Sequence, residues 1–217
     1  MTGRRQFLRS ATSNLAAMAA LGAMPDHASY PAADEWDLAW PERLKGKRRA
    51  VFDAAGIESG IPVFRAAIWT NQCVTVLGAA RPDVSPVIVL RGHAVALALT
   101  QAFWDKYSVG RVAHVTHPVT MKETSRNPVL MDASDGLPPP MLAGGLPKQL
   151  ANGATVLACN VALQAWIDAI RQRNGVSDAD ARKEAVGALV PGVILQPSGL
   201  LAAYLAQQHG CAYISAS

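Results

Sequence analysis

Pro86-Val87-Ile88-Val89-Leu90 is an unbroken run of apolar, mostly β-branched residues. Such a run is typical of a strand that is covered on both faces, as in the parallel sheet of an α/β protein. Four further short apolar runs predict strands, at 49–53, 154–159, 193–196 and 211–215.

Segments with the apolar spacing of helices lie between these strands. They cover residues 62–77, 94–107, 161–173, 178–189 and 199–209. Strands that alternate with helices in this way predict an α/β fold with a mainly parallel, doubly wound sheet. Residues 111–147 interrupt the alternation, because they contain Ser125-Arg126-Asn127-Pro128 and Pro138-Pro139-Pro140. We expect a long irregular loop there, which in a compact domain is usually functional or part of an assembly.

The N-terminus has the pattern of a twin-arginine signal. Arg4-Arg5 is followed by Phe7-Leu8 and by a weakly apolar segment at 11–24. This segment is shorter than the roughly 20 apolar residues that span a bilayer, so we expect no stable membrane span. The prediction is a signal peptide at 1–33, cleaved somewhere between about residues 23 and 33, and a single domain at 34–217. The twin-arginine translocase would then be a partner during export to the periplasm. The alternatives are an ordinary amphipathic helix or an uncleaved anchor.

Composition limits the classes of function. Half of the chain is apolar and only 17% is charged, which disfavours disorder. Removal of residues 1–33 takes away three arginines and Asp26 and lowers the net charge from +4 to +2. The basic character therefore belongs largely to the signal, and no nucleic-acid partner is expected.

Three cysteines, Cys73, Cys159 and Cys211, leave at least one thiol free. Cys73 lies late in a predicted helix and Cys211 begins a predicted strand. Both positions fall at the rim of the sheet opposite to Cys159. A Cys73–Cys211 disulfide is therefore conceivable, and buried free thiols are the default expectation.

Polar residues follow the predicted strands at their carboxyl ends, where open parallel sheets bind ligands. These residues are Asp53, Glu58, Ser59, Arg91, His93, Cys159, Asn160, Gln196 and Ser198. We expect them to converge on one rim of the sheet.

Cys159 is the chemically distinctive member of this rim. It directly precedes a predicted helix, and helix N-termini favour anions and thiolates. The rival interpretation is a small residue that ends a buried strand and is inert. Arg91 and His93 would hold an anion or a thiolate, or would form a hydrogen-bonded pair in a tight turn.

Other chemistries have weak signals. His114 and His117 lie in the predicted loop without a clear third ligand, which disfavours a metal site. No dinucleotide or Walker-type motif is present, so no cofactor is identified. Ser198 lies in Pro-Ser-Gly rather than in a nucleophile elbow, and is better explained as a helix cap.

Several short motifs occur in an order that resembles the DsrE/DsrF-like proteins, over about residues 50–215. They are Val89-Leu90-Arg91-Gly92-His93, Arg126-Asn127-Pro128, Cys159-Asn160 after a strand, Val190-Pro191-Gly192-Val193, Gln196-Pro197-Ser198-Gly199 and Gly210-Cys211-Ala212-Tyr213-Ile214. The exported branch that they resemble is largely uncharacterised. The resemblance implies a flavodoxin-like three-layer sandwich, homo-oligomers (trimers or hexamers) and, more loosely, sulfur carriage on a cysteine persulfide. Sulfur-relay members carry a cysteine near the second helix, whereas residues 94–107 contain none and only Cys159 has a family-like position.

Two functions follow. The first is an exported protein that handles sulfur or thiols through Cys159, assisted by Asn160, Arg91 and His93. The second is a non-catalytic, oligomeric module that binds a small anion at the same rim.

Overall fold

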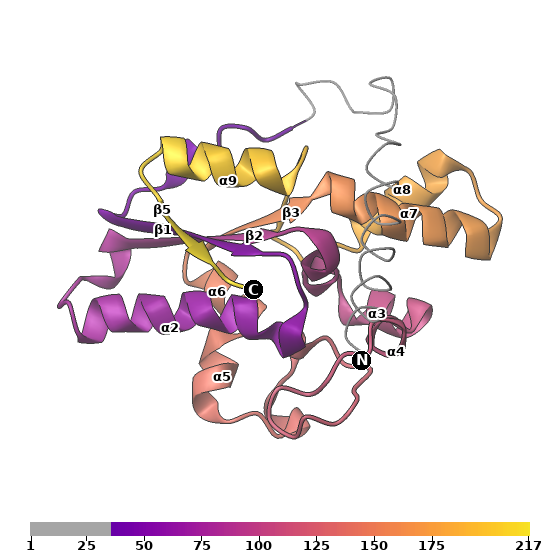
Figure 1. The fold of residues 1–217 in the computed structure, drawn as a ribbon, viewed down its shortest axis with the longest axis horizontal. Helices are drawn as coiled ribbons and strands as arrows, with labels where there is room; N and C mark the ends of the chain where they lie inside the picture. The colour runs from indigo at the N-terminus through magenta and orange to yellow at the C-terminus, as the bar shows by residue number, and fades with distance from the viewer. Residues whose placement is uncertain (1–35) are drawn as a thin grey trace, which may run out of the picture. The chain divides into compact units, whose positions relative to one another are not determined.

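A sheet of five parallel strands forms the centre of the computed structural model, which describes residues 36–217 (Figure 1). The strands are β1 (Arg48–Ala54), β2 (Val84–Leu90), β3 (Thr155–Cys159), β4 (Ile194–Gln196) and β5 (Ala212–Ser215). Their order across the sheet is β4-β3-β2-β1-β5, and every neighbouring pair is parallel. All five predicted strands are confirmed, as is the α/β class. The predicted signal, with Arg4 and Arg5, lies outside the described residues.

The sequence of β2 is continuously apolar because the strand is buried on both faces of the sheet. It lies in the middle of the sheet, and all seven of its residues are buried. Its register pairs Leu90 with Ala54 of β1 and with Ala158 of β3, so the three strands end at nearly the same level. This alignment creates the common rim that the sequence predicts.

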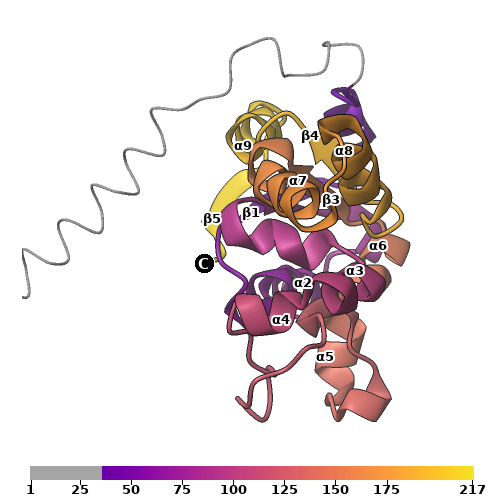
Figure 2. The same cartoon turned by 90° about the vertical axis from the view of Figure 1, so that its right-hand side faces the viewer.

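Helices cover both faces of the sheet. One face packs against α2 (Ile61–Thr75), α3 (Gln101–Tyr107), α7 (Asn160–Asn174) and α8 (Asp178–Gly187). The other face packs against α9 (Gly199–Gln208) and the short 3-10 turn η4 (Trp40–Arg43). Figure 2 shows α9 on one side of the strands and α2 on the other. The arrangement is consistent with a flavodoxin-like three-layer sandwich.

The helix expected at 94–107 is in fact two elements, so that prediction was wrong in detail. A 3-10 segment, η7 (Gly92–Ala98), precedes α3, and Leu99 and Thr100 between them are extended. Leu99 forms an antiparallel bridge with Leu189, and the Thr100 N–H donates to Ala188 O at 2.9 Å. Pairing with a distant segment therefore overrides the local helical spacing.

The segment 111–147 is less irregular than predicted. It includes the end of α4 (Val109–Val112), two 3-10 turns at Pro128–Leu130 and Ala133–Asp135, and α5 (Pro139–Gly144). α6 (Leu146–Ala151) then leads into β3. The proline run does not exclude helix, since proline is well suited to the first turn of one. Across residues 36–217, no helix has both the length and the apolar character that a membrane crossing requires.

Candidate functional site

The strand order reverses between β1 and β5, because β2, β3 and β4 follow one another on one side of β1 and β5 lies on its other side. The helix that follows β3, α7, packs with the apolar cluster on one face, whereas α9, which follows β4, packs on the other. In open α/β sheets, ligands bind beyond the carboxyl ends of the strands at such a switch point. Here the strand ends beside that point are Asp53 of β1 and Ser215 of β5, which are paired in register, and Cys159 lies two strands away at the end of β3.

Strand alternation places the key side chains on one face. Val89 and Leu157 belong to the apolar cluster beneath α9. Residues two positions further along a strand share that face, so Arg91 and Cys159 follow them on the α9 side. Asp53 follows Val51 of the same cluster on β1. Of the predicted rim residues, Asp53, Arg91 and Cys159 therefore lie on the same face at neighbouring strand ends.

Arg91 and Asp53 form a two-pronged ion pair at this rim. Arg91 Nε donates to Asp53 Oδ1 at 2.6 Å and Nη2 donates to Oδ2 at 2.9 Å. The hydroxyl of Tyr213, on β5, donates to Asp53 Oδ2 at 2.6 Å. Asp53 is 5% exposed. Together with Tyr213, the pair therefore links β5 to the carboxyl ends of β1 and β2.

The electrostatics of this cluster are mutually reinforcing. Burial alone would raise the pKa of Asp53, but the hydrogen bonds from Arg91 and Tyr213 outweigh it and hold that pKa below the usual value. The same hydrogen bonds raise the pKa of Arg91 and of Tyr213. A smaller contribution to the raised pKa of Arg91 comes from Cys159, which places the two within electrostatic range. Because Asp53 neutralises Arg91, the rim offers little free positive charge to a small anion.

Cys159 ends β3 and caps α7. Its Sγ accepts a hydrogen bond from the Ala162 N–H at 3.4 Å, the position of an N-cap side chain. The residue is 5% exposed. The structure thus confirms the predicted position at a strand end and a helix N-terminus, and shows that the thiol is enclosed.

Ser198 and Gly199 bring the start of α9 against Arg91. Ser198 is the N-cap, since its Oγ accepts from Leu201 N at 3.1 Å, which confirms the helix-cap interpretation. A Cβ at Gly199 would lie 2.6 Å from Arg91 Cβ. Only glycine permits α9 to approach the arginine so closely.

Two of the predicted rim residues have other roles. Asn160 is buried, and its Oδ1 accepts from Arg182 Nη1 at 2.7 Å, so the side chain links α7 to α8. Gln196 is fully buried; it accepts from Trp40 Nε1 at 3.0 Å and donates to Asp37 O at 2.8 Å. Gln196 therefore holds the segment before β1 against the sheet.

His93, Glu58 and Ser59 lie after the strand ends but do not join the cluster. His93 and Glu58 are exposed, and Glu58 and Ser59 have positive φ angles of 40° and 55° in a tight turn. Ser59 Oγ is hydrogen bonded to Thr116 Oγ1 at 2.7 Å. In the described part of the chain, no hydrogen bond or ion pair connects His93 to Cys159.

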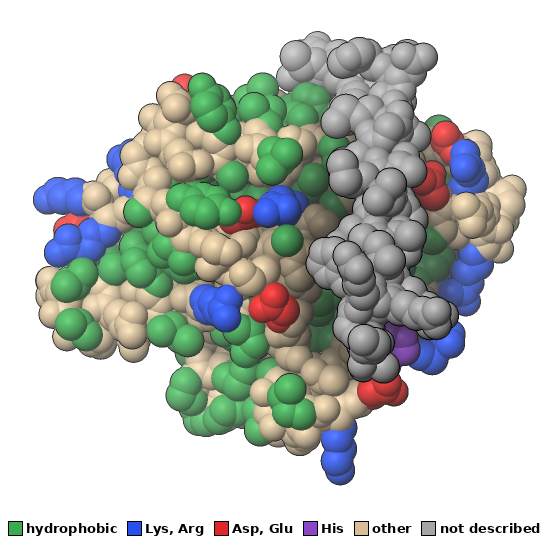
Figure 3. All heavy atoms as spheres, viewed as in Figure 1, with side chains coloured by type: hydrophobic (Ala, Val, Ile, Leu, Met, Phe, Trp, Pro, Cys, Tyr) green, Lys and Arg blue, Asp and Glu red, His purple; other side chains and the backbone are tan. Residues whose placement is uncertain are grey.

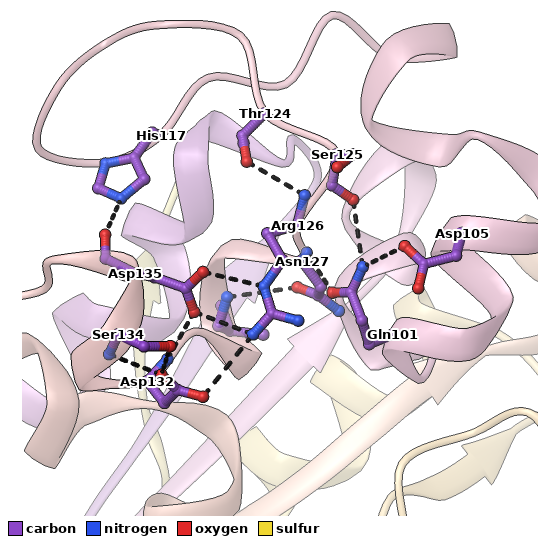
Figure 4. Close-up of polar contacts among 11 residues, drawn as sticks. Gln101, Asp105, His117, Thr124, Ser125, Arg126, Asn127, Asp132, Ser134 and Asp135 are labelled. Atoms are coloured by element: carbon purple, nitrogen blue, oxygen red, sulfur yellow. Dashed lines mark hydrogen bonds and ion pairs between the residues drawn. The ribbon is translucent and has the colours of Figure 1, made fainter.

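The long loop contains a second polar network, drawn in Figure 4. Arg126 donates to both carboxylate oxygens of Asp135, at 3.0 and 2.9 Å. Asp135 and Asp132 cap the same 3-10 turn reciprocally. His117 Nε2 bonds to Asp135 O at 2.8 Å, and its Nδ1 accepts from the backbone of Val119. Both ring nitrogens of His117 are therefore hydrogen bonded within the loop. Within residues 36–217, no group of three or more His, Cys, Asp or Glu residues could hold a metal ion.

Asn127 anchors this network to the core. Its Nδ2 donates to Leu97 O at 3.1 Å and to Leu99 O at 2.9 Å, and the residue is fully buried. Gln101 Oε1 accepts the Asn127 N–H at 2.9 Å. The loop is therefore fixed to η7 and α3 by its own polar side chains.

Cys73 and Cys211 are buried free thiols, as is Cys159, so the possible disulfide is not formed. Burial raises the pKa of the Cys211 thiol to about 11. Cys211 packs in the apolar cluster beneath α9. It is thus a small core residue rather than a reactive group.

Sequence reasoning did not identify the partnership of Asp53 and Tyr213 with Arg91. Asp53 ends a predicted strand, which was a usable signal. No local sequence signal pointed to Tyr213, because its position beside Asp53 depends on β5 lying next to β1 rather than next to β4.

Comparison of the chain with family models, curated proteins and solved structures found no match.

Proposed function

We propose that this protein handles sulfur through Cys159, accepting a sulfur atom as a persulfide and passing it on. The observation that carries the proposal is the position of Cys159 at the carboxyl end of β3, with its Sγ bonded to the first turn of α7. Of the three cysteines, it alone combines a strand's carboxyl end with the start of a long helix.

The first turn of α7 supplies the main stabilisation for a thiolate. A helix N-terminus contributes about 0.3–1 kcal/mol, and up to about 2 kcal/mol when partly buried. Arg91 adds a positive charge within electrostatic range, although Asp53 offsets most of it. Asp53 and Tyr213 act as positioning residues, because they fix the guanidinium beside the strand end.

The chemical step is an exchange between sulfur atoms. The Cys159 thiolate attacks the outer sulfur of a donor persulfide, R–S–SH, forming a new S–S bond. The old S–S bond breaks, and the donor leaves as the thiolate R–S⁻, so no external oxidant or reductant is needed. An acceptor thiolate takes the outer sulfur from Cys159 by the same step in reverse. Since Cys159 is 5% exposed, both partners reach it only when neighbouring residues move.

We further propose that the chain belongs to the DsrE/DsrF-like proteins, forms a homo-oligomer and is exported by the twin-arginine translocase. The order of the motifs around Arg91, Cys159 and Ser198 supports the family assignment. The pattern Arg4-Arg5 with Phe7-Leu8 supports export.

The competing proposal of an anion-binding module receives less support from the geometry. Arg91 is the cation nearest the strand ends of β1 and β2, and both of its side-chain hydrogen bonds go to Asp53. An anion would have to displace a buried carboxylate that is already held by two partners.

The test is mass spectrometry on protein purified from the periplasm of an expressing bacterium, before and after treatment with a low-molecular-weight persulfide. We expect signal cleavage, an oligomer under native conditions, and a gain of about 32 Da, the mass of one sulfur atom. Iodoacetamide should label Cys159 faster than the other two thiols. Cys159→Ser should lose the gain in mass, and the matched variants Cys73→Ser and Cys211→Ser should retain it.

Each readout can fail on its own. Equal labelling of the three thiols, or a mass gain that survives Cys159→Ser, would remove the sulfur proposal. An uncleaved chain confined to the cytoplasm would remove export, and a monomer would remove the assembly.

A further inference from the structure

The two edges of the sheet differ in how they are protected from pairing with another chain. Proline, charged side chains and covering segments are the usual protection of an edge strand. β4 has prolines close to both of its ends, Pro191 and Pro197, and Gln196 holds the segment before β1 against it by donating to Asp37 O. β5 forms the opposite edge, and residues 211–217 contain neither a proline nor a charged side chain. Among the described strands, β1 alone pairs with β5, so one side of β5 stays open.

The backbone of β5 directs hydrogen-bonding groups to this open side. In a parallel pair, the N–H and C=O of one residue point to the same neighbouring strand, and those of the next residue point the other way. The Ala216 N–H donates to Asp53 O of β1 at 2.9 Å. By this alternation, residues 212 and 214 also bond to β1. The N–H and C=O groups of Tyr213 and Ser215 therefore face the open edge.

These outward groups match a second copy of the same strand. When two β5 strands run antiparallel about a twofold axis at Ile214, Tyr213 of one copy lies opposite Ser215 of the other, and Ile214 lies opposite itself. Opposite residues in an antiparallel pair alternate between hydrogen-bonded and non-bonded positions. Tyr213 and Ser215 fall at hydrogen-bonded positions, where their outward groups bond to each other. Ile214, whose backbone faces β1, falls at the non-bonded position between them.

The side chains around the open edge also suit a contact between identical copies. A twofold axis brings each residue close to its own copy, so like charges there would repel, and β5 has none. Tyr213 is exposed, and its hydroxyl bond to Asp53 holds the ring in place. Leu200 and Tyr204 are exposed on α9, and Figure 3 shows hydrophobic side chains over α9 and β5. Aromatic side chains and a lack of charge are typical of the core of an interface.

We propose that two copies of this chain pair through their β5 edges, antiparallel about a twofold axis at Ile214, and so join their sheets into one. The proposal rests on the homo-oligomer proposed above and assigns one of its contacts. A closed assembly with a twofold axis contains an even number of copies. A dimer or a hexamer therefore fits this contact, and a trimer does not.

Cross-linking tests the position of the axis. At a non-bonded position of an antiparallel pair, the two Cα atoms lie about 4.5 Å apart, within the range of a disulfide. Ile214→Cys should therefore link two chains on oxidation with diamide, which a non-reducing gel shows as a doubled mass. The matched control is Ala212→Cys, because residue 212 lies opposite residue 216 of the other copy and roughly 13 Å along the strand from its own copy. Wild type is a second control, since its three thiols are buried.

Ser215→Pro tests the backbone bonds. It removes an N–H that faces the open edge and spares the bonds to β1, and proline is tolerated at such positions of an edge strand. Light scattering at micromolar concentration should show an even-numbered assembly for wild type and association weakened about tenfold or more for Ser215→Pro. Leu200→Lys should also weaken association. The matched control is Val112→Lys, since Val112 is an exposed apolar residue on α4, in a different part of the fold (Figure 1).

The outcomes separate this contact from the other proposals. A monomer or a trimer would overturn it, and slow deuterium exchange at Tyr213 and Ser215 in a monomer would show that another segment of the chain covers the edge. An even-numbered assembly in which Ile214→Cys links no better than Ala212→Cys, or which Ser215→Pro leaves unchanged, would keep the homo-oligomer and overturn this interface. Ser215→Pro should still gain about 32 Da through Cys159, so the outcome is independent of the sulfur experiment.

Discussion

Two arginine–aspartate pairs with the same two-pronged geometry hold two different regions together. Arg91 and Asp53 meet at the strand ends with distances of 2.6 and 2.9 Å, whereas Arg126 and Asp135 meet in the long loop at 3.0 and 2.9 Å. The first pair is 38 residues apart in the sequence and the second is nine. Their geometry is nearly equal, and their surroundings differ.

The strand-end pair is part of the tertiary structure. Asp53 is 5% exposed and also receives the hydroxyl of Tyr213, so its loss affects three strands at once. Asp135 is 16% exposed, and its other contacts, to Asp132 and His117, stay within the same loop. An ion pair that joins distant strands can fail only with the whole domain, whereas one that closes a loop can fail by local opening.

Neutralising each aspartate tests this difference directly, and the strand-end pair should show the largest effect. Asp53→Asn should lower the free energy of unfolding by about 2–3 kcal/mol, somewhat less than the usual 3–5 kcal/mol for breaking a buried pair because Arg91 is one-third exposed. Asp135→Asn should cost about 1 kcal/mol or less. Urea denaturation measures both values.

The two variants should also differ in where they open. Asp135→Asn should speed proteolysis within 113–138 without a matching loss of global stability, and Asp53→Asn should not. Equal global losses for the two variants would show that burial and connectivity do not separate the pairs.

Gly199→Ala probes the packing around the strand-end pair and should have the next largest effect. The added Cβ would lie 2.6 Å from Arg91 Cβ and 3.1 Å from its Cδ, so α9 or the arginine must shift. Overpacking of this kind costs about 1–3 kcal/mol. The matched control is Gly187→Ala in α8, where a new Cβ meets nothing within 4 Å. That change should stabilise slightly, because alanine is the better helix former. If Gly199→Ala proved equally harmless, the arginine would be free to move.

The contrast between contacts within a local segment and contacts between distant segments also explains how much of the structure could be predicted from the sequence. The strands were predictable because a strand that is buried on both faces has an unbroken run of apolar residues, as β2 does. Their common rim was predictable because the carboxyl ends of parallel strands lie at the same edge of the sheet. Ser198 was predictable as a cap because capping is local: its partner, Leu201, is three residues away.

The failures share a cause, which is dependence on distant partners. The break at Leu99 and Thr100 comes from pairing with residues 188–189, and Gln196 is held by an indole 156 residues away. Gln196 therefore looked like a rim residue when only its strand was considered. The position of Tyr213 beside Asp53 follows from the strand order, which local patterns do not contain.

The smallest expected effect comes from Tyr213→Phe, which removes one of the three hydrogen bonds to Asp53. Tyr213 is 49% exposed, so the cost at pH 7 should be about 0.5–1 kcal/mol, at the low end for a hydrogen bond to a charged group. The control is Tyr204→Phe on α9, which is similarly exposed at 56% and whose hydroxyl has no hydrogen bond within the described residues.

The pH dependence of the loss caused by Tyr213→Phe gives the sharper test. The pKa of Tyr213 is raised above its usual value of about 10, so its contribution is complete below pH 10 and is lost as the pH rises through the raised pKa. The pKa of Asp53 is lowered, so its contribution is present above about pH 4 and is lost as the pH falls through the lowered pKa. Urea denaturation should therefore show a constant gap between wild type and Tyr213→Phe from about pH 5 to pH 9, and a closing gap above pH 10. A gap that stayed constant up to pH 11 would mean that the tyrosine hydroxyl does not stabilise the strand-end pair, and the loop and the rim would then differ only in the burial of their aspartates.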